Sequence, residues 1–89
     1  MYLHLGQDTV VRTKNIIGIF DLENTSVSKL TRAFLATAQK AGQVVDVTQE
    51  LPKSFVICQE NGNTVVYITQ ISCATLRKRA GFLEGIANL

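Results

Sequence analysis

The chain has 89 residues, of which 46% are hydrophobic and 18% charged, and its nine basic and seven acidic side chains give a formal net charge of +2. This length suits one domain, and so apolar a composition argues against an intrinsically disordered chain. No apolar run approaches the roughly 18 residues needed to cross a bilayer, and the start MYLHLGQD lacks a signal-peptide pattern, so we expect a cytoplasmic protein without a membrane anchor.

Short strands are predicted first, at residues 2–5, 10–13 and 16–20, because β-branched and other apolar residues gather there between turn residues. A helix follows, with Ser26 or Ser28 as its N-cap and Gly42 as its C-terminal stop. Apolar side chains recur along it at three- and four-residue spacing, which predicts one buried face. They are Val27, Leu30, Phe34, Ala38 and Ala41.

The second half predicts strands at 44–48, 55–60 and 64–69, and a short helix that begins after Ser72 and ends at Gly81. Asn61-Gly62 predicts a type I′ hairpin between the last two strands, because both residues tolerate positive φ.

We therefore expect one α+β domain at residues 1–81, with a small, mostly antiparallel sheet, one longer and one short helix, and a tail at 82–89. The passage from the strand at 16–20 through the long helix to the strand at 44–48 is also compatible with one parallel pair.

Catalysis finds little support in the sequence. His4 is the only histidine, and no nucleophile elbow or glycine-rich phosphate loop is present. Cys58 and Cys73 form no CxxC pair, and we interpret them as reduced structural thiols. We predict no catalytic residue, no metal site and no cofactor.

The two predicted helices contain six of the nine basic residues and no acid. Lys29, Arg32 and Lys40 lie on the arc opposite the apolar face of the long helix. A basic face without acids forgoes stabilising i,i+4 ion pairs, which favours a polyanion partner. Long basic side chains also simply solvate a helix, and a basic last turn complements the helix dipole, so both interpretations stay open. Arg12 and Lys14 form a second small basic cluster.

Three segments carry a resemblance to a known family: MYLHLGQDTVVRTKNIIGIFDLENTSVSK, AGQVVDVTQELPKSFVICQENGNTVVYITQIS and TLRKRAG. In order and spacing they are similar to the RemA/RemB family of small extracellular-matrix regulators of Gram-positive, spore-forming bacteria, over about residues 1–81. The resemblance implies a transcriptional regulator of biofilm matrix genes. It also implies a domain related to the LytTR type, whose subunits close into rings able to wrap DNA.

The resemblance also points to the site. RemA-type members carry DNA-contacting arginines just before the strand equivalent to 55–59, where this chain reads ELPKS and keeps only Lys53. Another family arginine falls at about Asn15. We predict phosphate contact, and no base readout, by one set of residues. They are Arg12, Lys14, Asn15 and Lys53, with Lys29 and Arg32 next. Leu51 and Ser54 are expected to be exposed enough to accept arginine.

Two functions remain open, because most of the family's charge is missing from ELPKS. The leading one is an oligomeric, non-enzymatic regulator that binds duplex DNA through its phosphates. The alternative is a protein-interaction module that assembles with itself or with a RemA-type partner and does not contact DNA.

Overall fold

The computed structural model describes residues 1–23 and 28–81 of the chain. The elements are, in chain order, β1 (Tyr2–Gly6), β2 (Thr9–Arg12), the 3-10 turn η1 (Thr13–Asn15), β3 (Ile16–Asp21), α1 (Lys29–Lys40), β4 (Val44–Asp46), β5 (Ser54–Glu60), β6 (Asn63–Thr69) and α2 (Cys73–Arg79). Each predicted strand and helix is present, so the prediction of an α+β domain is confirmed. Among the described residues, neither helix combines the length and the apolar character needed to cross a bilayer.

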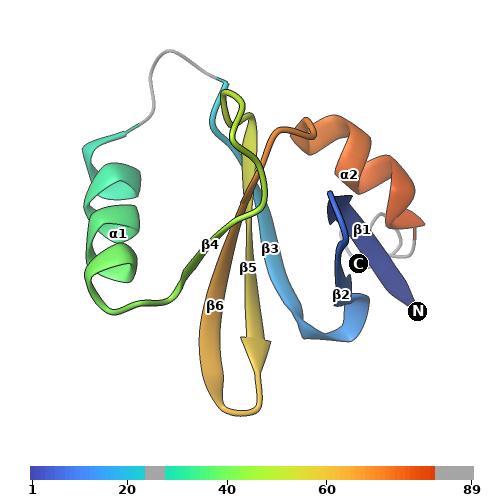
Figure 1. Cartoon of the computed structure of the whole chain (residues 1–89), viewed down its shortest axis with the longest axis horizontal. Coiled ribbons are helices and arrows are strands. Elements are labelled where there is room, and N and C mark those ends of the chain that lie inside the picture. The colour runs from blue at the N-terminus through green and yellow to red at the C-terminus, as the bar shows by residue number, and fades with distance from the viewer. Residues whose placement is uncertain (24–27, 82–89) are drawn as a thin grey trace.

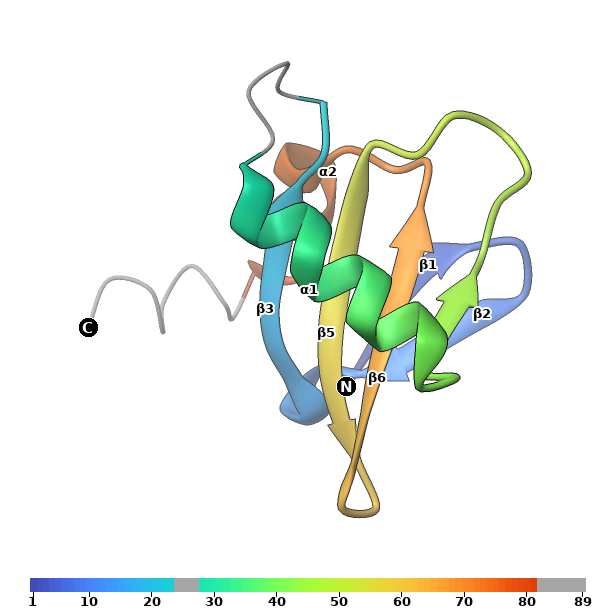
Figure 2. The ribbon, with the colours of Figure 1, turned by 90° about the vertical axis from the view of Figure 1, so that its left-hand side faces the viewer.

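The elements form three layers (Figure 1). The central layer is a four-stranded sheet in the order β3-β5-β6-β4. α1 crosses one of its faces diagonally, whereas the β1-β2 hairpin and α2 cover the other face (Figure 2). The prediction of one sheet is therefore wrong. The hairpin buries Leu3, Leu5 and Val11 against the face of the large sheet. It therefore packs on that sheet through side chains and forms a separate two-stranded sheet, without a strand ladder to the large one within the residues that the structure describes.

The parallel pair also differs from the expected one. β4 pairs in parallel with β6, as in Val44↔Val66, and the other ladders are antiparallel. β3 and β4 lie at opposite edges of the sheet, because the β5-β6 hairpin occupies the space between them. Asn61 and Gly62 in that hairpin have φ values of 51° and 82°, so the predicted turn with two positive φ angles is confirmed.

β5 is central and contributes to two cores. Phe55 and Ile57 pack with the side chains of α1, whereas Val56 and Cys58 face the hairpin and α2. Cys58 and Cys73 are buried free thiols, as predicted. Burial, with a smaller effect of the Glu60 charge, raises the pKa of Cys58 to about 12.

α1 begins after Ser28, whose Oγ accepts a 3.1 Å hydrogen bond from the Thr31 amide. Ser26 and Val27 lie outside the described residues. The predicted buried face is partly wrong, because Leu30 is 81% exposed. The stripe that faces the sheet includes Leu35 and the buried Ala38, so the helix is rotated away from the face predicted from its sequence.

Candidate nucleic-acid interface

Three of the predicted phosphate-binding residues lie together where β2 runs into η1. Arg12 ends β2, and Lys14 and Asn15 follow in the 3-10 turn. The buried Thr13 fixes this turn, since its amide and its hydroxyl both donate to the Met1 carbonyl oxygen, at 3.0 and 3.1 Å. The turn therefore presents its polar side chains from an anchored backbone.

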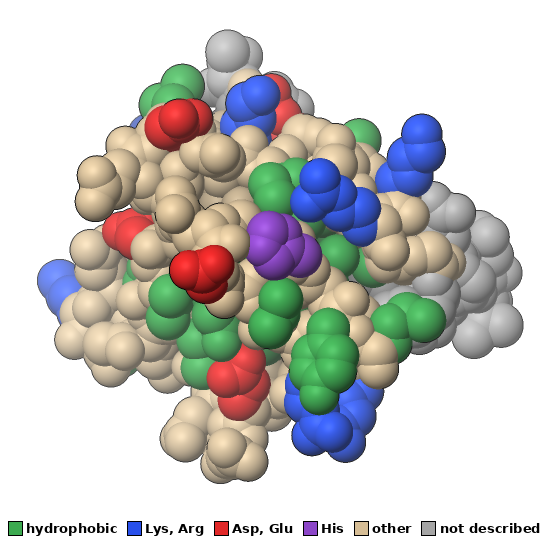
Figure 3. All heavy atoms as spheres, turned by 45° about the vertical axis from the view of Figure 1, so that its right-hand side comes forward, with side chains coloured by type: hydrophobic (Ala, Val, Ile, Leu, Met, Phe, Trp, Pro, Cys, Tyr) green, Lys and Arg blue, Asp and Glu red, His purple; other side chains and the backbone are tan. Residues whose placement is uncertain are grey.

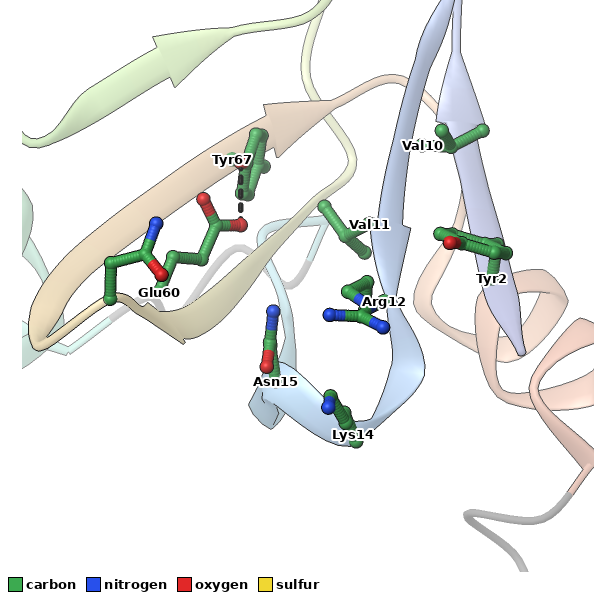
Figure 4. A pocket seen from close by; sticks show the side chains of 9 residues that line it. Tyr2, Val10, Val11, Arg12, Lys14, Asn15, Glu60 and Tyr67 are labelled. Carbon is green, nitrogen blue, oxygen red and sulfur yellow. Dashed lines mark hydrogen bonds between the residues drawn. The ribbon is translucent and has the colours of Figure 1, made fainter.

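These residues line a cleft of about 430 Å³ between the β1-β2 hairpin and the end of the β5-β6 hairpin. Figure 4 shows Arg12, Lys14 and Asn15 on one side of it and Glu60 and Tyr67 on the other. The Tyr67 hydroxyl donates a 2.8 Å hydrogen bond to Glu60 Oε2. Burial, followed by this hydrogen bond, raises the pKa of Tyr67 above its ordinary value.

The two walls of the cleft carry opposite charges. Neither Arg12 nor Lys14 forms an ion pair with any residue in the described part of the chain, and both are exposed. Glu60 is half-buried and held by Tyr67. The cleft can therefore offer two cations to an anionic group and one carboxylate to a hydrogen-bond donor.

Lys53 lies elsewhere, immediately before β5, while Glu60 at the far end of that strand lines the cleft. Seven strand residues separate these ends, which is about 20 Å at the usual rise per residue. The backbone of Lys53 is held on both sides, since its amide donates to Thr69 O at 2.9 Å and its carbonyl accepts from the Leu22 amide at 2.8 Å. The side chain is exposed.

The two neighbours of Lys53 that were expected to be exposed behave differently. Leu51 is 83% exposed, as expected. Ser54 is fully buried, and its Oγ donates a 2.7 Å hydrogen bond to the Ile71 carbonyl. The prediction for Ser54 is wrong, because pairing of β5 with β6 draws this residue into the sheet opposite Thr69.

Lys29 and Arg32 are exposed on the first turns of α1, on the opposite side of the large sheet from the hairpin. The six predicted residues thus fall into three groups, in the cleft, at the ELPKS loop and on α1.

Sequence reasoning missed the Glu60-Tyr67 pair. The predicted Asn61-Gly62 turn contained the relevant signal. Its register pairs Glu60 with Asn63, so Glu60 and Tyr67 fall on one face of the hairpin.

The face that carries the hairpin and α2 shows how charge is distributed. In Figure 3 the acidic side chains lie mainly in the left half and centre, whereas the larger groups of basic side chains lie at the upper right and lower right. α2 adds Arg77, Lys78 and Arg79 in its last turn. Arg77 is partly engaged, since its Nη2 donates a 3.1 Å hydrogen bond to the Ile19 carbonyl on β3.

Comparison with known proteins agrees with the resemblance found in the sequence. The chain is 39% identical over 83 residues to Extracellular matrix regulatory protein B of Bacillus subtilis (strain 168), which covers 93% of this chain and 94% of that protein. The sequence model of the RemA-like family, described as Extracellular matrix regulatory protein A-like, matches residues 2–80. The chain therefore belongs to the RemA-like family of extracellular matrix regulatory proteins.

Proposed function

We propose that this protein regulates extracellular-matrix genes in the cytoplasm by binding duplex DNA through phosphate contacts, as a homo-oligomer and without catalysis. Membership of the RemA-like family supports the regulatory role. The observation that carries DNA contact is the anchored η1 turn. It presents Arg12 and Lys14 side by side, exposed and without an ion pair in the described part of the chain. The family resemblance also implies a domain related to the LytTR type, which would agree with DNA contact.

The predicted contact is weak for each subunit. Lys53 is the one cation of the ELPKS loop, and the cations of α1 lie on another side of the sheet. Each phosphate neutralised by a cation releases counterions and contributes about 0.9 to the log–log salt slope on B-DNA. A homo-oligomer, closed into a ring as the family resemblance implies, would make several weak contacts act together.

Affinity for duplex DNA at about 50 mM and about 200 mM salt tests the proposal, with the double variant Arg12→Gln/Lys14→Gln beside wild type. We expect weaker binding to all sequences alike and a salt slope lower by about 0.9 for each lost contact. The matched control is Lys40→Gln/Lys78→Gln, which removes the same charge from exposed positions outside the cleft. Equal losses of affinity in both double variants would show that binding depends on net charge and not on the cations of the cleft.

One observation favours the alternative of a protein-interaction module. Phe20, Leu30 and Phe34 are exposed by 42%, 81% and 39%, and Leu30 lies one turn of α1 before Phe34; we call these three residues the apolar patch. The rings of Phe20 and Phe34 both stack on Phe55, with centroids 5.0 and 6.4 Å from it. Exposed apolar clusters of this kind mark protein contacts. If wild type binds no duplex at low salt but associates with itself or with a RemA-type partner, this function replaces DNA binding.

A further inference from the structure

We propose that the cleft between η1 and the β5-β6 hairpin binds a small nucleoside phosphate. The ligand would place its phosphate against Arg12 and Lys14 and a hydroxyl or amine group against Glu60. This binding does not require that the protein binds DNA, whereas its effect on DNA rests on the proposed function.

The cationic wall suits a terminal phosphate. The Arg12 guanidinium can donate two parallel hydrogen bonds to phosphate oxygens, and Lys14 adds a mobile point charge. The Asn15 amide on the same wall supplies a neutral donor. Because Thr13 ties the turn to Met1, little backbone order has to be gained on binding.

The opposite wall decides what else the ligand carries. Glu60 uses one oxygen to accept from Tyr67, and an ionised carboxylate retains further acceptor sites for a ligand hydroxyl or amine. The same carboxylate repels a second phosphate. A polyanion that enters the cleft as far as Glu60 therefore meets repulsion, whereas a molecule with one phosphate and a sugar or base bearing N–H or O–H groups complements both walls.

Size and the rim agree with a mononucleotide. The cleft volume of about 430 Å³ falls in the range of small-molecule sites, which is about 300–1,000 Å³. Tyr2 and Val10 add exposed apolar surface to the lining, at 64% and 52% exposure.

Occupancy has a consequence for the proposed DNA contact. A bound phosphate neutralises Arg12 and Lys14, the two cations that we assign to the duplex. A nucleoside phosphate would therefore compete with DNA and lower its apparent affinity, which makes the cleft a point of regulation.

The test uses the full chain without DNA, with adenosine 5′-monophosphate, inorganic phosphate and adenosine as probes. NMR titration follows the amide signals of the cleft residues, and calorimetry gives affinities. We expect the nucleotide to bind more tightly than inorganic phosphate or adenosine. Arg12→Gln should weaken the binding of nucleotide and of inorganic phosphate alike, by at least about tenfold. Lys40→Gln, the matched charge control outside the cleft, should change neither affinity.

Glu60→Gln separates a two-sided ligand site from a plain anion site. It should lower the ratio of nucleotide to phosphate affinity by about fivefold or more, because a neutral acceptor replaces a charged one while repulsion of phosphate disappears. Thermal unfolding checks that each variant folds. If Glu60→Gln does not fold, Tyr67→Phe replaces it. The ratio of nucleotide to phosphate affinity should then fall as well, because the Glu60 carboxylate loses the hydrogen bond that holds it at the cleft wall.

Three results would overturn the inference: no saturable change at cleft residues with the nucleotide, equal wild-type affinity for nucleotide and phosphate, or an unchanged affinity ratio in the Glu60→Gln or Tyr67→Phe variant. A separate competition assay then adds the nucleotide to the DNA complex. Nucleotide binding without any duplex binding would contradict the proposed function and leave the cleft assignment standing.

Discussion

The hydroxyl of Thr69 on β6 donates a 2.5 Å hydrogen bond to the backbone carbonyl of Leu5 on β1, which joins the two sheets. Both residues are fully buried. The same oxygen accepts a 3.1 Å hydrogen bond from the Ile71 amide. One side chain thus satisfies two backbone groups at the junction between the large sheet and the hairpin that carries Arg12.

Replacing Thr69 with valine keeps the shape of the side chain and removes both hydrogen bonds. We expect the free energy of unfolding to fall by about 2 kcal/mol or more, because the buried Leu5 carbonyl loses its partner. The melting temperature should fall by about 10 °C, measured by calorimetry at matched protein concentration. Thr64→Val on the same strand is the control. Its hydroxyl bonds the exposed Gln59 side chain at 3.2 Å, so its cost should stay within about 0.5 kcal/mol. Equal costs would show that Thr69 does not couple the sheets.

Alkaline pH should destabilise the protein through Cys58. Burial raises its pKa to about 12, whereas the unfolded thiol titrates near the ordinary value of 9.0. The folded state holds the Cys58 proton more tightly than the unfolded state does. The stability that this protonated thiol contributes is therefore constant below the unfolded pKa and is lost as pH rises toward the folded pKa. The free energy of unfolding should fall above about pH 9, by up to about 1.4 kcal/mol per pH unit for this group.

Urea unfolding under reducing conditions from about pH 8 to about pH 11 measures this effect. Cys58→Ala should be less stable than wild type at about pH 8 but should show a shallower decline as pH rises. Cys73 and Tyr67 also have raised pKa values, so some decline should remain in the variant. Parallel curves for wild type and Cys58→Ala would contradict the assignment to this thiol.

Local signals predicted the parts of the fold that local chemistry decides. Asn61-Gly62 defined a hairpin because its two residues tolerate positive φ, and Ser72 capped α2 by accepting from the Thr75 amide. Long-range packing decided the rest. The sequence placed β1 as a strand, but only the burial of Leu3 and Leu5 against the large sheet shows that the hairpin forms a sheet of its own.

The candidate site shows the same division. Lys14 and Asn15 are consecutive, so their proximity was predictable. The wall that faces them comes from another hairpin, and no local sequence pattern predicts that Glu60 and Tyr67 lie across the cleft from Arg12. Ser54 illustrates the error most clearly: it stands in a polar stretch beside an exposed lysine, yet it is buried because β5 begins there.

Self-association should depend on the apolar patch of Phe20, Leu30 and Phe34. Leu30→Glu should shift the protein toward monomer in light scattering at micromolar concentration, because it places a charge in the apolar contact surface. The fold should tolerate the change, since Leu30 is 81% exposed and makes few contacts with the core. Leu51→Glu is the matched control, since Leu51 is 83% exposed and lies in the ELPKS loop. If both variants keep the wild-type mass, the patch is not the oligomer contact. A wild-type particle of 9.8 kDa would refute self-association altogether.

The ELPKS loop gives the last prediction, because its charge can be changed in both directions on a fixed backbone. Leu51→Arg adds a cation at an exposed position beside Lys53, and the hydrogen bonds of Lys53 to Thr69 and Leu22 remain in place. If the loop contacts phosphate, the log–log salt slope for duplex DNA should become steeper by about 0.9 for each subunit in contact. Lys53→Glu should weaken binding of all sequences alike, since phosphate contacts carry no base information.

Ser54→Arg is the wrong way to restore the charge. It would bury a guanidinium in place of the Ser54-Ile71 hydrogen bond, and we expect it to lower the free energy of unfolding by more than about 3 kcal/mol. The DNA measurement therefore compares wild type, Leu51→Arg and Lys53→Glu, with oligomeric state checked on the same samples. A steeper slope for the first and a weaker affinity for the second would place the duplex against this loop. Identical affinity and slope in all three proteins would remove Lys53 from the interface and leave Arg12 and Lys14 as its proposed centre.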